Sequence, residues 1–117
     1  MSYFTISELT RSATAAREGI DNTPPQSAID NMKRLINTVL NPARQQLNAP
    51  IYVNSGYRCP ELNRRVGGAL RSYHLQGRAA DLTTRPNRNA ELMAILRQLP
   101  HTELINEGNG TWIHVAL

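Results

Sequence analysis

The segment Ser72-Tyr73-His74-Leu75-Gln76-Gly77-Arg78-Ala79-Ala80-Asp81 carries the strongest structural and chemical signals in this sequence. His74 and Asp81 are separated by six residues, and both have side chains that bind borderline metal ions such as zinc. Gly77 and the small alanines after it predict a turn that leads into a closely packed strand. We therefore expect a loop and a buried strand to bring two metal ligands together.

A third candidate ligand, His114, lies in the apolar segment Trp112-Ile113-His114-Val115-Ala116-Leu117. Two imidazoles and one carboxylate leave the fourth position of a tetrahedral zinc ion open for water, which is typical of a catalytic site. Structural zinc sites are closed by four ligands, mostly cysteines, and this chain has one cysteine, Cys59. Considered singly, either histidine is an ordinary core or loop residue. Asp81 differs, because a buried carboxylate needs a metal, an arginine or several hydrogen-bond donors.

The composition describes one globular domain over residues 1–117. The chain has 117 residues, 40% of them apolar, which is enough for a single hydrophobic core. No apolar run approaches the ~20 residues that cross a membrane, and the N-terminus lacks the basic and apolar regions of a secretory signal. We therefore expect a chain made in the cytosol, without a membrane span. The single cysteine excludes an internal disulfide.

The chain is basic, with a net charge of +4. This charge favours anionic surroundings, either nucleic acid or an anionic bacterial wall polymer. The 13 lysine and arginine residues are scattered along the sequence and form no dense run with interleaved aromatic residues. Because a nucleic-acid surface normally gathers such residues, we expect no nucleic-acid partner.

Helical signals dominate the first half of the sequence. Thr23 as N-cap and Pro24 at the first helical position predict the start of a long helix. Pro42 should kink this helix or divide it near Asn41. The apolar positions recur at intervals of three and four and predict one buried face: Ile29, Met32, Leu35, Ile36, Val39, Leu40, Ala43 and Leu47.

The second half alternates short strands and helices. The predicted strands cover residues 51–53, 78–82, 104–107 and 112–117, and the predicted helices cover residues 61–66 and a segment ended by Pro100. Gly108-Asn109-Gly110 between the last two strands is a hairpin signal. Helices followed by mixed strands and helices predict an α+β fold, with a small antiparallel sheet and flanking helices.

Two further residue types have a role in metal-assisted hydrolysis. A water molecule activated by zinc needs a base to take its proton, and glutamate is a common choice. Glu103 and Glu107 both precede the last strand, and we prefer Glu107 because it ends its strand beside the glycine turn. Arg58 follows Ser55-Gly56-Tyr57 and is a candidate for binding a substrate carboxylate or polarising a carbonyl. Read alone, each is an ordinary surface charge.

Five motifs stand out along the sequence: Ser55-Gly56-Tyr57-Arg58, Asn63, Val66-Gly67-Gly68, Ser72-x-His74-x-x-Gly77-x-Ala79-Ala80-Asp81 and Trp112-x-His114-Val115. Together they resemble one family of zinc metallopeptidases, the M15 family. Its members are D-alanyl-D-alanine carboxypeptidases and peptidoglycan endopeptidases of bacteria and phages, and the segment from Phe4 to Pro25 resembles the leader of small phage and prophage members. The resemblance covers nearly the whole chain.

The resemblance implies a fold shared with the hedgehog signalling domain, with His74, Asp81 and His114 as the zinc ligands. It also implies that Arg58 binds or polarises the substrate and that Ser72 supports the site. Tyr73, Gln76 and Trp112 are expected to bind substrate or to support the ligands. We expect a monomer that cleaves peptidoglycan stem peptides with Zn²⁺ as cofactor, as an endolysin does, and that reaches the wall only after release.

The sequence departs from the family pattern at one position. Many relatives carry the catalytic acid three residues before the last histidine, where this chain has Thr111. We therefore expect Glu107, seven residues before His114, to be the catalytic base. Two alternatives stay open: D-alanyl-D-alanine carboxypeptidase rather than endopeptidase action, and a non-catalytic zinc-binding module of a phage.

Overall fold

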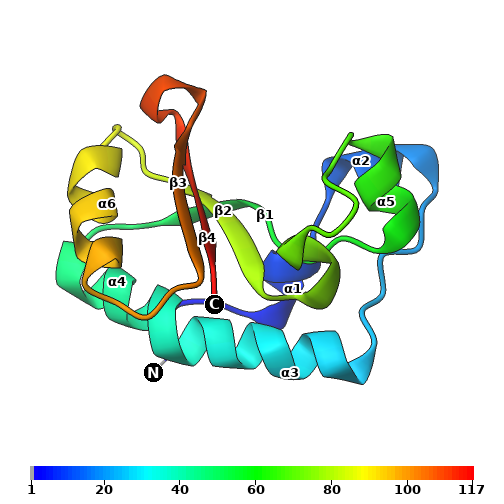
Figure 1. Cartoon of the computed structure of the whole chain (residues 1–117), viewed down its shortest axis with the longest axis horizontal. Helices are drawn as coiled ribbons and strands as arrows, with labels where there is room; N and C mark the ends of the chain where they lie inside the picture. The colour runs from blue at the N-terminus through cyan, green and yellow to red at the C-terminus, as the bar shows by residue number, and fades with distance from the viewer. Residues whose placement is uncertain (1) are drawn as a thin grey trace.

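A computed structural model describes residues 2–117 and shows an α+β fold built on one four-stranded antiparallel sheet (Figure 1). The strand order is β1-β2-β4-β3, so the last strand of the chain is inserted between the second and the third. The predicted fold class is confirmed. The strands are β1 (Tyr52–Ser55), β2 (Ala79–Thr83), β3 (Glu103–Glu107) and β4 (Trp112–Ala116).

The helices lie on both sides of this sheet and along its lower edge in Figure 1. Helices α4 and α6 flank one side, α1, α2 and α5 lie on the other, and α3 runs beneath the strands. Their bounds are α1 (Ile6–Thr10), α2 (Ala13–Glu18), α3 (Gln26–Leu35), α4 (Asn41–Leu47), α5 (Pro60–Arg65) and α6 (Asn89–Arg97). Short helical segments of other types are η1 (Ile36–Leu40), η2 (Tyr73–Gln76) and η3 (Gly108–Gly110). None of the helices within residues 2–117 is long and apolar enough to cross a membrane.

The predicted long helix is present, and its interruption takes the form of a π-helical segment. Segment η1 ends directly before α4, and the Asn41 N–H bonds to the carbonyl of Ile36, five residues earlier. Pro42 lacks an N–H, and its ring crowds the carbonyl four residues before it. The wider π turn makes room for that ring, so the backbone stays in the right-handed helical region through Leu40 and Asn41.

The predicted start of this helix was wrong. Helix α3 begins at Gln26, and Pro25 before it is extended, with ψ of 165°. A residue that precedes a proline is disfavoured in the helical region, so Pro24 cannot open a helix in front of Pro25. The Thr23 hydroxyl instead donates a hydrogen bond to the Asp21 carboxylate at 2.6 Å.

The alternation of side chains along β2 and β4 separates a core face from a polar face. Leu82, Ile113 and Val115 are completely buried in the core with the apolar face of the long helix. Asp81 lies between the buried residues Ala80 and Leu82, and His114 lies between Ile113 and Val115, so the Asp81 and His114 side chains leave the opposite face of the sheet. The hairpin predicted around Gly108-Asn109-Gly110 is confirmed, because β3 and β4 pair antiparallel on either side of it.

Candidate metal centre

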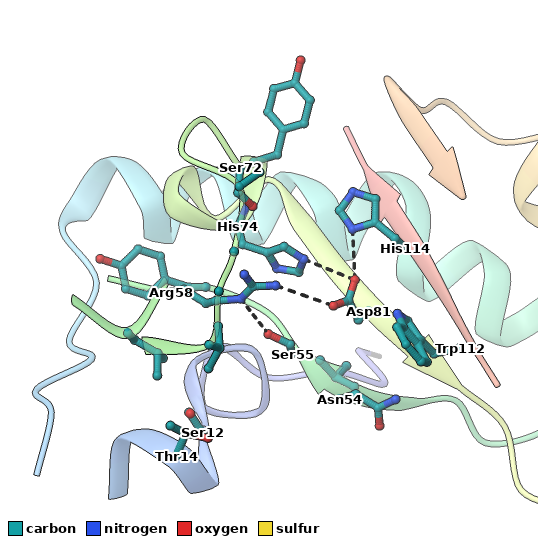
Figure 2. A pocket seen from close by; sticks show the side chains of 18 of the residues that line it. Ser12, Thr14, Asn54, Ser55, Arg58, Ser72, His74, Asp81, Trp112 and His114 are labelled. Carbon is teal, nitrogen blue, oxygen red and sulfur yellow. Dashed lines mark hydrogen bonds and ion pairs between the residues drawn. The ribbon is translucent and has the colours of Figure 1, made fainter. Parts of the chain in front are cut away.

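His74, Asp81 and His114 converge, with their ligand atoms all within 4.8 Å of one another. Asp81 and His114 are direct partners in the β2–β4 ladder, and His74 comes from η2, immediately before β2. Asp81 Oδ1 lies 3.2 Å from His74 Nε2 and 3.0 Å from His114 Nδ1. Figure 2 shows the Asp81 carboxylate at the centre of this cluster, with both imidazoles pointing toward it.

His74 is held by the backbone around it. Its Nδ1 lies 2.7 Å from the carbonyl oxygen of Gly56, and its own N–H donates to the Ser72 hydroxyl at 3.1 Å. Because a carbonyl oxygen only accepts hydrogen bonds, Nδ1 must carry a proton, and Nε2 is the nitrogen that faces Asp81. Gly56 is required here, since a Cβ at this position would overlap the carbonyl oxygen of Leu9.

His114 is oriented in the same way by a side chain. Its Nε2 lies 2.8 Å from Glu103 Oε1, while its Nδ1 points at Asp81. The Glu103 carboxylate accepts the Nε2 proton, which leaves the Nδ1 lone pair directed toward the cluster. The sequence pattern does not reveal this contact of Glu103 with His114, because it marks Glu103 only as an alternative base.

The ligand atoms of this cluster suit a divalent metal ion. When both neutral rings commit their protons to Gly56 and Glu103, three acceptor atoms face one another: His74 Nε2, His114 Nδ1 and the Asp81 carboxylate. Such an arrangement needs either protons or a cation between its members. Two protonated rings whose centroids are 5.2 Å apart would repel each other. One cation satisfies all three acceptors at once, and two imidazoles with a carboxylate form a set that binds zinc.

The pKa values of these groups reflect the same geometry. Burial alone would raise the pKa of the Asp81 carboxyl. With no metal bound, hydrogen bonds that the His114 and His74 rings donate to the Asp81 carboxylate outweigh burial and hold this pKa well below its usual range. The hydrogen bond with Asp81 raises the pKa of His114 against the effect of burial, and Glu103 adds to the rise. The cluster therefore attracts positive charge, which a metal ion would supply.

Arg58 lies beside the cluster, and two side-chain hydrogen bonds hold its guanidinium in place. Its Nη1 donates to Asn63 Oδ1 at 2.8 Å and its Nε donates to the Ser55 hydroxyl at 3.2 Å, while its Nη2 lies 3.7 Å from Asp81 Oδ2. Burial lowers the pKa of the Arg58 guanidinium, and the charge of Asp81 opposes that effect. Gly68 packs closely against the side chains of Asn63 and Arg58, so a Cβ at this position would overlap both Asn63 Oδ1 and Arg58 Nη1.

The cluster opens into a cavity of about 850 Å³. Its wall on the sheet side includes the three candidate ligands together with Glu103, Glu107 and Trp112, and residues of α2 and the loop after α5 line the other side. Glu107 is half-buried at the end of β3, directly across the ladder from Trp112. Within residues 2–117 the Glu107 carboxylate makes no hydrogen bond or ion pair, so it is free to act on a molecule in the cavity.

The remaining candidates occupy different positions. Ser72 caps η2 through the His74 N–H, and Tyr73 lines the cavity beneath the Arg78 guanidinium, 4.4 Å from its ring centroid. Gln76 is placed elsewhere: it is not part of the cavity wall, and its Oε1 accepts a hydrogen bond from Arg78 at 3.2 Å. The expectation of a site role for Gln76 therefore has no support from its position.

The α+β fold thus places two histidines and one aspartate, a group that could hold a metal ion, on the wall of a cavity. The model of the family Peptidase M15 matches residues 2–116, nearly the whole chain. The chain belongs to the M15 peptidase family, as the sequence motifs indicated. Comparison with curated proteins gave no match.

Proposed function

We propose that this chain is a zinc-dependent peptidase that hydrolyses a peptide bond in peptidoglycan stem peptides. The observation that carries the proposal is the convergence of three acceptor atoms, from His74, Asp81 and His114, on the wall of a cavity. Membership in a peptidase family supplies the reaction class. The peptidoglycan substrate rests on the resemblance to cell-wall peptidases and on the net charge of +4, which favours an anionic wall.

Each residue of the site would have a separate role in the hydrolysis. His74, Asp81 and His114 would hold a zinc ion, which would supply Lewis-acid polarisation of a water molecule and of the scissile carbonyl. Glu107 accepts the proton that the attacking water loses and returns it to the leaving amine. Arg58 donates hydrogen bonds to the oxygen that gains negative charge as the carbonyl becomes tetrahedral.

The rigidity of Arg58 matters for this role. A guanidinium already held by Ser55 and Asn63 needs no reordering when the substrate binds, so its interaction with developing charge carries little entropic cost. The position of Thr111, where many relatives carry the acid, is consistent with a structural role in this chain. The Thr111 hydroxyl donates to the carbonyl of Gly108 at 2.8 Å and closes the hairpin turn, whereas Glu107 lines the cavity.

Purified peptidoglycan digested by the protein tests the proposal. We expect new amine groups and released peptides, loss of this activity after treatment with a chelator, and its return when zinc is added. Mass spectrometry of the products distinguishes an endopeptidase, which separates stem peptides internally, from a carboxypeptidase, which releases only D-alanine. Absence of either product from zinc-loaded, folded protein would favour the non-catalytic zinc-binding alternative.

A further inference from the structure

Glu103 stands behind His114, on the side of the ring that faces away from the ligand cluster. Glu103 Oε1 lies 2.8 Å from His114 Nε2, whereas the Nδ1 atom of the same ring faces Asp81. In the β3–β4 ladder His114 is paired with Ile105, so Glu103 lies diagonally across from it, two residues along β3. This diagonal is within reach of a long side chain such as glutamate.

We infer that Glu103 is a positioning residue, which sets the ring nitrogen and the orientation that His114 offers to the metal. The inference deepens the proposed function and rests on His114 being a zinc ligand. A carboxylate that accepts the Nε2 proton fixes the tautomer with its lone pair on Nδ1. It also raises the basicity of Nδ1, because the negative charge stabilises the positive charge that metal binding places on the ring.

The two histidines differ in how they are held, and this difference makes Glu103 testable. His74 is buried, and a backbone carbonyl, that of Gly56, receives its outer proton. No substitution of a side chain removes that carbonyl. His114 depends on a side chain for the same purpose, and the Glu103 side chain is 42% exposed, so it contributes little to the core.

The same geometry separates Glu103 from Glu107. Both glutamates line the cavity, and β3 places them on one face of the sheet. The Glu103 carboxylate is already engaged by the outer nitrogen of His114, while the Glu107 carboxylate makes no hydrogen bond or ion pair within residues 2–117. Strand β3 thus carries two glutamates with different roles. Glu103 orients a metal ligand, and Glu107 accepts a proton from water.

Zinc affinity measured in competition with a chromophoric chelator tests this inference without any substrate. We expect Glu103→Ala to weaken zinc binding by about 10–100-fold, the usual effect of losing the partner behind a ligating histidine. Glu103→Gln should lose less zinc affinity, because the amide oxygen of glutamine still accepts the hydrogen bond from Nε2, although it carries no negative charge. Glu107→Gln and the distant surface variant Glu91→Gln should bind zinc as the wild type does.

A spectroscopic measurement shows whether Glu103 acts through His114. In long-range ¹H–¹⁵N spectra of the zinc-loaded wild type, we expect His114 to carry its proton on Nε2. Glu103→Ala should alter the His114 ring signals and leave those of His74 unchanged. The melting temperature of the metal-free Glu103→Ala protein should stay close to the wild-type value, which a role in general stability would not allow.

Two results would overturn the inference in different ways. If Glu103→Ala binds zinc with wild-type affinity while His114→Ala does not, Glu103 has no positioning role and the proposed zinc site still stands. If His114→Ala itself binds zinc with wild-type affinity, His114 is not a ligand, and the site on which the proposed function depends is wrong as well.

Discussion

Asp81 and His114 face each other across the β2–β4 ladder, and Asp81 Oδ1 lies 3.0 Å from His114 Nδ1. The two residues are 33 positions apart in the sequence, yet the register of one antiparallel strand pair makes them neighbours. His74, from the segment that precedes β2, completes the cluster. Four predictions test whether this cluster binds zinc and whether the residues around it catalyse hydrolysis.

The first prediction concerns the ligands. We expect one zinc ion per wild-type chain and a loss of zinc in His74→Ala, Asp81→Asn and His114→Ala, because each removes one of three protein ligands. His101→Ala is the matched control, since His101 is exposed and bonds only to the carbonyl of Leu99 within residues 2–117. Metal analysis of the purified, folded variants measures the effect. Wild-type zinc content in any of the first three would remove that residue from the set.

The second prediction concerns the base. Glu107→Gln keeps the size of the side chain but cannot accept a proton, so we expect the rate to fall by roughly 10²–10⁴-fold. Zinc content should not change. Glu91→Gln, on the exposed surface of α6, is the control for the substitution itself. Glu103→Gln is unsuitable as a control because Glu103 contacts His114. Undiminished hydrolysis by Glu107→Gln would assign the base to another residue.

The third prediction concerns Arg58. In Arg58→Ala, Asn63 Oδ1 loses its donor while it is buried, and this should lower the free energy of unfolding by about 1–3 kcal/mol. We expect the protein to stay folded and its turnover to fall, because the substrate oxygen loses its hydrogen-bond donor. Ser55→Ala removes only the contact to Arg58 Nε and should affect turnover far less. A large drop in melting temperature with unchanged activity would make Arg58 a purely structural residue.

The fourth prediction concerns Gly68. A methyl group there would overlap Asn63 Oδ1 and Arg58 Nη1, so Gly68→Ala must displace the Asn63 amide and the Arg58 guanidinium. We expect a loss of activity with zinc content unchanged, because the metal ligands are not touched. Gly67→Ala is the comparison: its φ of +72° is strained for alanine, but its Cβ would meet nothing within 4 Å. Equal losses of activity in both variants would indicate general damage to the turn.

Much of the fold could be predicted from local patterns. The helical spacing of Met32, Leu35 and Val39 identified the buried face of the long helix, because burial on one side of a helix imposes that period. The glycines around Asn109 identified the β3–β4 hairpin, because only such residues adopt the tight turn readily. The start of α3 was misplaced because the rule for an N-cap and the restriction on a residue before proline compete at Pro24 and Pro25.

The sequence by itself determined which residues could form a metal site. It contains three histidines, and the ligand chemistry and local context of His74, Asp81 and His114 are enough to single these three residues out. The tertiary structure decided what lies behind and beside them. Glu103 against His114 and the Gly56 carbonyl against His74 come from segments that no sequence period links to the ligands. Such contacts depend on strand register and on the close approach of backbones, and these are set by the packing of the whole chain.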